Sequence, residues 1–182
     1  MKLFLVTIIA CLAIIFPGSE SNLFYVTTSS VKFRSEAPLE VISAESSRMQ
    51  GVIDQEKRTF VFTVLNSSFQ GFNNSLQRVH FNENYMESDI YPLTSFKGKI
   101  IEEVDFNVPG VYQVRAKGLL TVHGIVKERI IRAQLTTGKD GVELESNFTV
   151  SLKDHNIRVP KVVHEKIASE IKIEIKAALK KK

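Results

Sequence analysis

Histidines are the residues of this sequence with the clearest potential for acid–base or metal chemistry. The four of them are His80, His123, His155 and His164. They form no HExxH motif and no pair four residues apart, so a zinc site would need ligands from separate elements of the fold. One interpretation is therefore a secreted metal-dependent hydrolase that uses His80, His123 and the carboxylates of Glu83 and Glu87.

These same residues also have simpler interpretations. His123 follows Thr121 and Val122 and precedes Gly124, so it stands where a strand enters a tight turn. An imidazole in such a place usually bonds a backbone carbonyl. Glu83 and Glu87 equally fit the solvated face of a short helix.

Most other catalytic chemistries lack a motif here. The single cysteine, Cys11, lies in the N-terminal apolar run, so the chain beyond it has no thiol nucleophile, disulfide or cysteine-ligated zinc. The sequence contains no Gly-x-Ser-x-Gly elbow, no dinucleotide fingerprint and no P-loop. It therefore predicts no catalytic residue, no metal and no cofactor.

Large apolar side chains are instead crowded between residues 69 and 96. They are Phe69, Phe72, Phe81, Tyr85, Met86, Tyr91 and Phe96. The interior of a small barrel needs only part of this set. Two interpretations stay open: an apolar cavity that holds a long apolar molecule, or the solid core of a structural or interaction module.

The elements that must position these side chains are β-strands, because apolar and polar residues alternate with a period of two. Near the C-terminus, for example, Ile171, Ile173 and Ile175 alternate with lysine and glutamate. Strands are predicted near residues 23–34, 39–45, 48–55, 58–66, 95–106, 111–122, 125–137, 142–153 and 170–179. Eight or nine antiparallel strands must close into a barrel or stack as two sheets, since an open sheet leaves bare edges.

One segment departs from this alternation. Leu76 and Val79 fall at helical spacing, and Asn74 or Ser75 is suited to cap the start of a helix. The sequence therefore predicts one short helix near residues 74–86 in an otherwise all-β domain.

Several stretches together resemble one known family. They are Asn66–Phe72, His80–Ser88, Tyr91-Pro92, Ser95–Ile100, Gly118–Gly124, Val159–Val162 and Lys166–Ala168. In order and spacing they are similar to the helix-then-strand signature, the strand–turn element and the approach to the last strand of the bacterial YceI-like family. The resemblance implies a lipocalin-like antiparallel β-barrel, exported to the periplasm, whose apolar pore holds a polyisoprenoid chain such as a quinone tail.

The resulting hypothesis is a non-catalytic protein that sequesters or transports an apolar lipid inside a barrel of about eight strands. The ligand is expected to contact inward-facing strand residues and a lid formed by residues 69–91. The predicted ligand-binding residues are Phe60, Phe62, Phe69, Phe72, Phe81, Tyr85, Met86, Tyr91, Phe96, Tyr112, Val114, Leu120 and Phe148.

The N-terminus predicts export. Lys2, an apolar run and Pro17-Gly18-Ser19 follow the order of a secretory signal, so residues 1–20 are expected to be a signal peptide and residues 22–182 the lipid-binding domain. Cleavage at Cys11, as in a lipoprotein, stays open as an alternative. The protein is expected to be periplasmic or secreted.

The charge pattern bears on partners. The net charge of +4 is carried by residues 161–182, which end in three lysines, while residues 22–160 are balanced. This pattern predicts no nucleic-acid binding, because a basic groove would run through the fold. The lysines fit a solvated tail or a weak contact with an anionic membrane surface. A homodimer also stays open.

Overall fold

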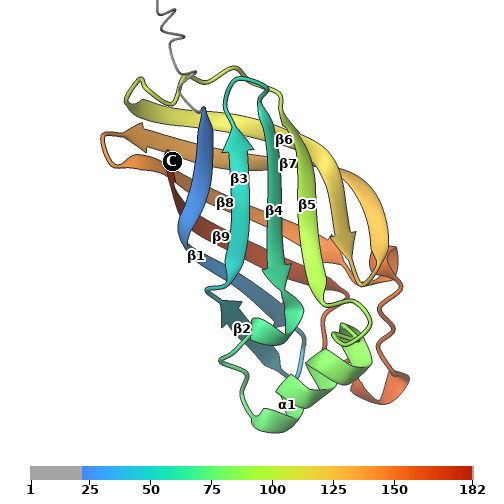
Figure 1. The fold of residues 1–182 in the computed structure, drawn as a ribbon. Coiled ribbons are helices and arrows are strands. Elements are labelled where there is room, and N and C mark those ends of the chain that lie inside the picture. Colours follow the sequence, from blue (N-terminus) through green and yellow to red (C-terminus); the bar gives the residue numbers. More distant parts are fainter. Residues whose placement is uncertain (1–21, 182) are drawn as a thin grey trace, which may run out of the picture.

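Nine β-strands pair in one antiparallel sheet in the computed structural model, which describes residues 22–181 (Figure 1). They are β1 (Leu23–Glu36), β2 (Val41–Ser46), β3 (Met49–Asp54), β4 (Thr59–Leu65), β5 (Leu93–Ile100), β6 (Gly110–Val122), β7 (Ile125–Gly138), β8 (Gly141–Ser151) and β9 (Glu170–Lys181). The sheet closes because β1 pairs with β9, from Phe24 opposite Lys181 to Arg34 opposite Lys172. The predicted signal peptide lies outside the described residues.

Strands β2 and β3 are two halves of one bent strand. β2 pairs with the second half of β1, with Val31 opposite Ser46, and β3 pairs with its first residues, with Leu23 opposite Asp54. Both pairings keep the same register. Eight strands therefore surround the interior, which confirms the predicted antiparallel, lipocalin-like barrel of about eight strands.

The alternation of residue types sets which face of each strand points inward. In β9, Ala177 and Leu179 are buried whereas Lys176 is exposed; in β4, Phe60 is buried whereas Val61 is exposed. Each apolar side chain withdrawn from water stabilises the closed barrel by roughly 25 cal/mol per Å² of buried surface. The inside of the barrel is consequently apolar on all sides.

A helical segment between β4 and β5, residues 66–92, covers one end of the barrel and is called the lid below (Figure 1). Its elements are η1 (Asn66–Ser68), α1 (Ser75–His80) and the π-helical turn η2 (Phe81–Tyr85). Asn74 caps α1, since its side chain accepts a 2.9 Å hydrogen bond from the Gln77 backbone N–H. The short helix predicted near residues 74–86 is confirmed.

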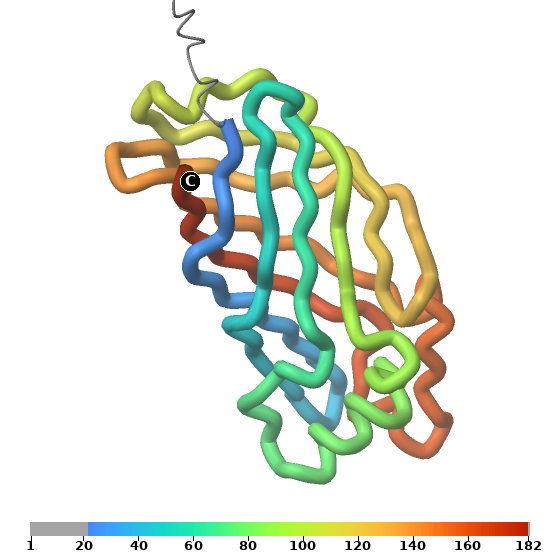
Figure 2. Tube along the Cα trace, in the orientation of Figure 1, coloured from blue at the N-terminus to red at the C-terminus, as the bar shows by residue number. Residues whose placement is uncertain are grey.

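The connection between β8 and β9 contains η3 (Lys153–His155) and η4 (Lys161–Val163) and lies at the lid end. The start of β1 and the end of β9 lie at the opposite end, so Lys180 and Lys181 are far from the lid (Figure 2). Among residues 22–181, no helix has both the length and the hydropathy of a membrane span.

The predicted range of one strand, residues 95–106, differs from the structure, in which β5 ends at Ile100. The Ile101 N–H still donates to the Arg115 carbonyl at 2.9 Å. Beyond it, the Glu102 carboxylate accepts the Arg115 backbone N–H at 2.6 Å and so takes the place of a strand carbonyl. The following loop, residues 101–109, crosses the end of the barrel opposite the lid (Figure 1).

Candidate functional site

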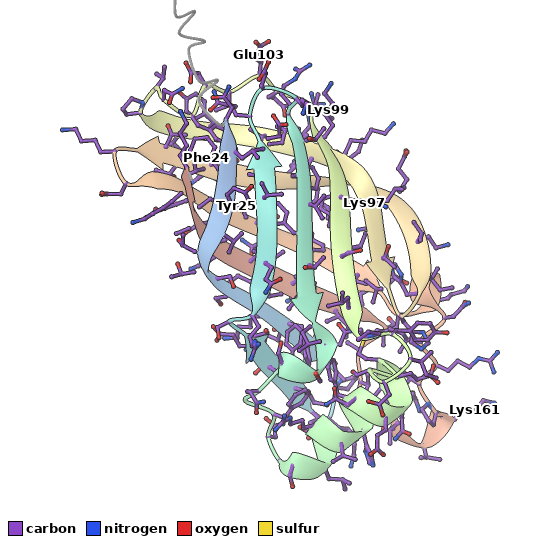
Figure 3. All side chains as sticks on the ribbon, viewed as in Figure 1. Phe24, Tyr25, Lys97, Lys99, Glu103 and Lys161 are labelled. Carbon is purple, nitrogen blue, oxygen red and sulfur yellow. The ribbon has the colours of Figure 1, made fainter. Side chains whose placement is uncertain are left out.

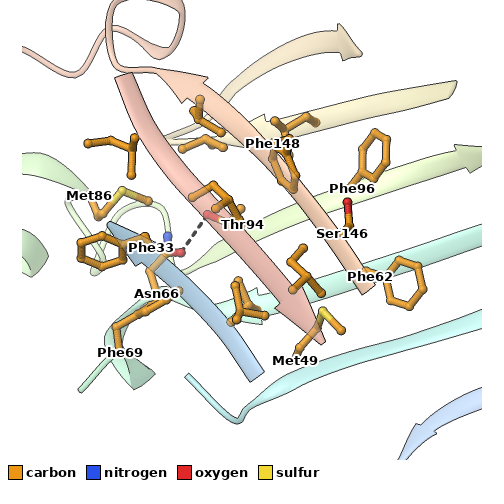
Figure 4. Close-up of a pocket in the computed structure, with 18 of the residues that line it drawn as sticks. Phe33, Met49, Phe62, Asn66, Phe69, Met86, Thr94, Phe96, Ser146 and Phe148 are labelled. Atoms are coloured by element: carbon orange, nitrogen blue, oxygen red, sulfur yellow. Dashed lines mark hydrogen bonds between the residues drawn. The ribbon is translucent and has the colours of Figure 1, made fainter. Parts of the chain in front are cut away.

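A cavity of ≈ 370 Å³ lies inside the barrel, and all nine strands and the lid contribute to its wall (Figure 4). Aromatic side chains from two neighbouring strands, β4 and β5, form one part of that wall. Phe60 and Phe62 of β4 lie with ring centroids 5.7 Å apart, and Phe96 of β5 lies 5.0 Å from Phe60. On the far side, Phe148 of β8 closes the wall. The barrel is thus hollow and has an apolar lining.

A second aromatic cluster forms the roof of the cavity under the lid. Phe33 of β1 stacks on Phe81 with ring centroids 5.2 Å apart and an interplanar angle of 10°. Phe69 and Phe72 from the lid pack on Phe33 at 5.4 and 5.7 Å. Such ring pairs are worth about 0.5–1.5 kcal/mol each beyond their burial, so the cluster attaches the lid to the barrel wall.

Eleven of the thirteen predicted ligand-binding residues line this cavity. They are Phe60, Phe62, Phe69, Phe72, Phe81, Tyr85, Met86, Phe96, Val114, Leu120 and Phe148. Tyr91 and Tyr112 do not line it. The Tyr91 ring lies against His123, with centroids 4.8 Å apart, and the Tyr112 hydroxyl donates to the Val108 carbonyl near the opposite end. Contact of any of these residues with a ligand stays a prediction.

The structure adds lining residues that the sequence hypothesis omitted. Phe33, Ile131, Ala133, Ile173 and Ile175 line the cavity from β1, β7 and β9. The alternation in β9 already placed Ile173 and Ile175 on an apolar face, so the same signal identifies them. The same signal marks Phe33, since Val31 and Phe33 alternate with Lys32 and Arg34 in the strand predicted at residues 23–34.

The fully buried polar side chains on the wall are hydrogen-bonded within the protein. Asn66 donates to the Tyr91 carbonyl at 2.7 Å and accepts from the Thr94 hydroxyl at 2.8 Å (Figure 4). The Ser146 hydroxyl donates to the Arg132 carbonyl at 2.7 Å, and Ser35 accepts from the backbone of Ala168 at 2.9 Å. The deep part of the cavity therefore presents a hydrocarbon surface to any occupant.

Unengaged polar groups line the cavity only toward the lid. Within residues 22–181, the side chains of Tyr85, His80 and Lys166 make no hydrogen bond or ion pair. Burial raises the pKa of the Tyr85 phenol, which keeps its hydroxyl protonated and able to donate. His80 and Lys166 are exposed, so the cavity reaches the surface at this end.

A polar contact joins the last turn of the lid to the β6–β7 hairpin. The His123 Nε2 lies 2.5 Å from a Glu87 carboxylate oxygen, and its Nδ1 lies 3.1 Å from the His155 carbonyl. The carbonyl contact confirms the simpler interpretation of His123. Glu87 and His123 both have left-handed backbones, with φ of 43° and 49°, which costs about 1–3 kcal/mol each. The contact therefore holds two strained positions together.

His155 itself is completely buried. Its Nδ1–H donates to the Ile125 carbonyl at 3.1 Å, while its Nε2 has no partner among the described residues. Burial lowers the pKa of this imidazole, although hydrogen bonds to backbone carbonyls partly oppose that shift. A neutral ring in this position links β7 to the β8–β9 connection.

The residues proposed for a metal-dependent hydrolase do not converge. Residues 22–181 contain no group of three or more His, Cys, Asp or Glu side chains placed to hold a metal ion. Glu87 and His123 form a pair with each other, whereas His80 lines the cavity at the lid and Glu83 is exposed.

Comparison with known proteins identifies the family. A family model described as YceI-like domain matches residues 24–179. The chain belongs to the YceI-like family. This match confirms the resemblance seen in the sequence. Among curated protein sequences, none matches the chain.

Solved structures share the YceI-like fold at low sequence identity. A polyisoprenoid-binding domain from Saccharophagus degradans, implicated in plant cell wall breakdown, has a TM-score of 0.74 at 10% identity and covers 88% of this chain and 99% of its own. BcnA from Burkholderia cenocepacia has a TM-score of 0.68 at 13% identity, with 82% and 94% covered. The YceI protein of Campylobacter jejuni has a TM-score of 0.54 at 18% identity and full coverage of both chains.

Proposed function

We propose that this protein binds an apolar lipid chain, of the polyisoprenoid or quinone-like class, inside its barrel. The observation that carries this proposal is the hollow interior. Its volume of ≈ 370 Å³ falls in the range of about 300–1,000 Å³ typical of small-molecule sites, and its buried polar groups are already satisfied. A solid core would leave no such space. The family membership and the polyisoprenoid-binding relative support the same ligand class.

We propose a binding role without catalysis. Burial of a hydrocarbon chain needs no reactive group, since withdrawal of apolar surface from water supplies about 25 cal/mol per Å². The separation of His80 from the Glu87–His123 pair supports this role over the hydrolase alternative. Sequestration or transport of the lipid is the corresponding function.

The arrangement of polar groups suggests how the ligand lies. A chain without polar atoms fits the deep part of the barrel, whereas a polar end fits beside Tyr85, His80 and Lys166 under the lid. The Tyr85 hydroxyl can donate to a carbonyl or phosphate oxygen there. The ligand is therefore an amphiphile that enters tail first.

The place of action is proposed from the sequence alone. The signal-like order of residues 1–20 supports export, and with it a periplasmic or secreted location. The weak membrane contact of the C-terminal lysines and a homodimer stay predictions.

A cavity-filling substitution tests the proposal directly. Ala133 lines the cavity, so Ala133→Phe should weaken binding of a fluorescent apolar probe, cis-parinaric acid, by about tenfold or more through loss of buried contact. The control is Val126→Phe, because Val126 is on the same strand, β7, is 53% exposed and does not line the cavity. Equal probe binding by both variants would argue that the cavity is not the site.

Protein purified from its native host supplies a second test. Organic extraction and mass spectrometry should yield a bound lipid with an apolar chain. Repeated extraction without any lipid, together with stoichiometric zinc or iron in elemental analysis, would instead favour the hydrolase.

A further inference from the structure

Three segments meet at the lid end, where the cavity reaches the surface. The Leu39 backbone N–H donates to the Glu165 carbonyl at 2.9 Å, and the Gln77 amide donates to the Glu40 carboxylate at 2.6 Å. Residues 37–40, 75–80 and 161–166 are therefore adjacent and are called the rim below. Residues of all three segments line the cavity, which places the rim around its mouth.

The rim carries large aliphatic side chains that point into solvent. Leu39 is 66% exposed, Leu76 is 60% exposed and Val162 is 90% exposed. They come from three separate segments that the hydrogen bonds above hold together. Exposed aliphatic side chains gathered on one surface usually mark a contact with a partner or a membrane.

The rim holds three cations and two carboxylates, so its formal net charge is +1 with the histidines neutral. Arg78, Lys161 and Lys166 have no ion-pair partner in the described part of the chain. Of the two acidic residues, Glu40 accepts hydrogen bonds from the Gln77 and Asn73 amides, and Glu165 lies 4.0 Å from His164. Lys161 lies at the same end of the molecule as α1, opposite Glu103 (Figure 3). The cations without an ion-pair partner thus lie on the same segments as two of the aliphatic side chains, Leu76 and Val162.

We propose that the rim docks on a membrane that contains anionic lipids, so that a lipid chain passes between the bilayer and the cavity. This inference rests on the proposed lipid-binding function. Aliphatic side chains insert at the headgroup boundary while neighbouring cations attract anionic headgroups. A second copy fits the rim less well, because a two-fold contact would bring six cations together with only four carboxylates, which already contact Asn73, Gln77 and His164.

Vesicle co-sedimentation tests the docking surface. The protein, purified from cells that express the full-length chain, should bind phosphatidylcholine vesicles that contain about one-third phosphatidylglycerol more tightly than pure phosphatidylcholine, and added salt should weaken that binding. The combined substitution Leu39→Ser, Leu76→Ser and Val162→Ser should reduce partition by about tenfold or more. Arg78→Gln with Lys161→Gln should remove most of the preference for the anionic vesicles.

The matched control alters exposed aliphatic residues on the barrel wall. Val61→Ser, Val111→Ser and Ile130→Ser change side chains that are 45%, 63% and 58% exposed and lie outside the rim. This variant should partition as the wild type does. Equal partition by the rim variant and the wild type would overturn the proposal, as would a loss that occurs only with Lys180→Gln and Lys181→Gln. A wild-type dimer that the rim substitutions dissociate would also overturn it.

Binding of cis-parinaric acid in vesicle-free solution separates this inference from the proposed function. The rim variant should bind the probe as the wild type does, because its substitutions lie outside the cavity. A wild type that partitions through the rim but binds no probe would contradict lipid binding and leave the docking surface standing. A protein that binds the probe but shows no rim-dependent partition would contradict the docking surface alone.

Discussion

The two ends of the barrel differ in how they meet the cavity. Opposite the lid, Phe24 and Phe106 are buried and meet edge to face at 5.0 Å, and neither lines the cavity. Acidic residues of the loop above them are hydrogen-bonded, Glu102 to Arg115 and Asp105 to Gln55. At the lid end the cavity instead reaches the surface beside the side chains of Tyr85, His80 and Lys166, which have no partner among residues 22–181.

This difference indicates that the two ends serve different purposes. Close packing of buried rings favours stability, as at the end closed by Phe106. A cavity lowers stability because its lining lacks packing partners, and it is retained where a ligand fills it. The structure therefore separates a stabilising end from a functional end, and substitutions at each end should have different effects.

The largest expected effect is at the closed end. Phe106→Ala removes a buried ring from close packing and should lower the free energy of unfolding by about 3–5 kcal/mol, as measured by chemical denaturation. Phe72→Ala at the lid end removes a half-buried ring that faces the cavity, so its cost should be only about 1–2 kcal/mol. Equal losses for the two variants would contradict the separation of the ends.

The next effect concerns Asn66, a buried polar residue at the start of the lid. Asn66 is 1% exposed, and Asn66→Ala would leave the Tyr91 carbonyl and the Thr94 hydroxyl without their partner. The expected loss of unfolding free energy is about 2–3 kcal/mol. Hydrogen exchange should also accelerate across the lid while the strands near Phe106 stay protected.

Asn66→Asp is the matched control for this anchor. The aspartate still accepts from Thr94 but places a carboxylate oxygen against the Tyr91 carbonyl, so it should destabilise the protein at least as much as alanine does. A stability close to that of the wild type would show that the Asn66 amide does not hold the lid.

Much of the barrel was predictable because its strands are half-buried. The alternation of residue types in β4 and β9 arises because one face of each strand is exposed to solvent and the other is buried. This alternation predicted the bounds of both strands within a residue or two. The premature end of β5 was not predictable in the same way. It depends on the Glu102 carboxylate reaching the Arg115 backbone, a contact between residues that only the folded barrel brings together.

The residues of the candidate site were also predictable from the alternation in the strands, but only where no contact between distant segments decides their position. Alternation identifies which residues of β6 point inward, and Val114 and Leu120 do line the cavity. Alternation does not indicate how far along the barrel axis a residue lies. Tyr112 is on the same face of β6 as Val114 but lies beyond the end of the cavity, near Val108. Tyr91 shows a further limit: its ring lies over Gly124, where a Cβ would come within 2.5 Å of the ring, and so turns away from the cavity.

A smaller effect should distinguish the lid end by its response to acid. Burial lowers the pKa of His155 in the folded state, so between that pKa and the unfolded value near 6.5 the unfolded chain binds more protons. Stability is therefore complete above that unfolded value and falls as the pH drops below it, by at most ~1.4 kcal/mol per pH unit for one proton.

His155→Gln is the variant that checks this response. Glutamine can donate to the Ile125 carbonyl but does not titrate, so denaturation midpoints of the variant should depend less on pH between neutrality and mild acid than those of the wild type. The same slope in both proteins would place the acid-sensitive group elsewhere.

The smallest expected effect concerns the contact between Glu87 and His123. The Glu87 side chain is 40% exposed, so solvent screens the pair, and Glu87→Gln should lower the free energy of unfolding by only about 0.5–1 kcal/mol. The effect of this substitution on the rate of ligand release should be clearer, because the contact between Glu87 and His123 attaches the last turn of the lid to the β6–β7 hairpin. Stopped-flow fluorescence should therefore show faster release of bound cis-parinaric acid to acceptor vesicles. The increase in rate should be larger than the small loss of unfolding free energy alone would cause.

The design of the control follows from the geometry of the pair. Lys117 and Glu128 form a surface ion pair at 3.4 Å between β6 and β7, away from the lid. Glu128→Gln therefore removes a comparable charge pair and leaves the lid unchanged. This control should leave the release rate unchanged. Equal acceleration in both variants would attribute the effect to overall charge, whereas acceleration confined to Glu87→Gln would identify the functional end as the end that opens.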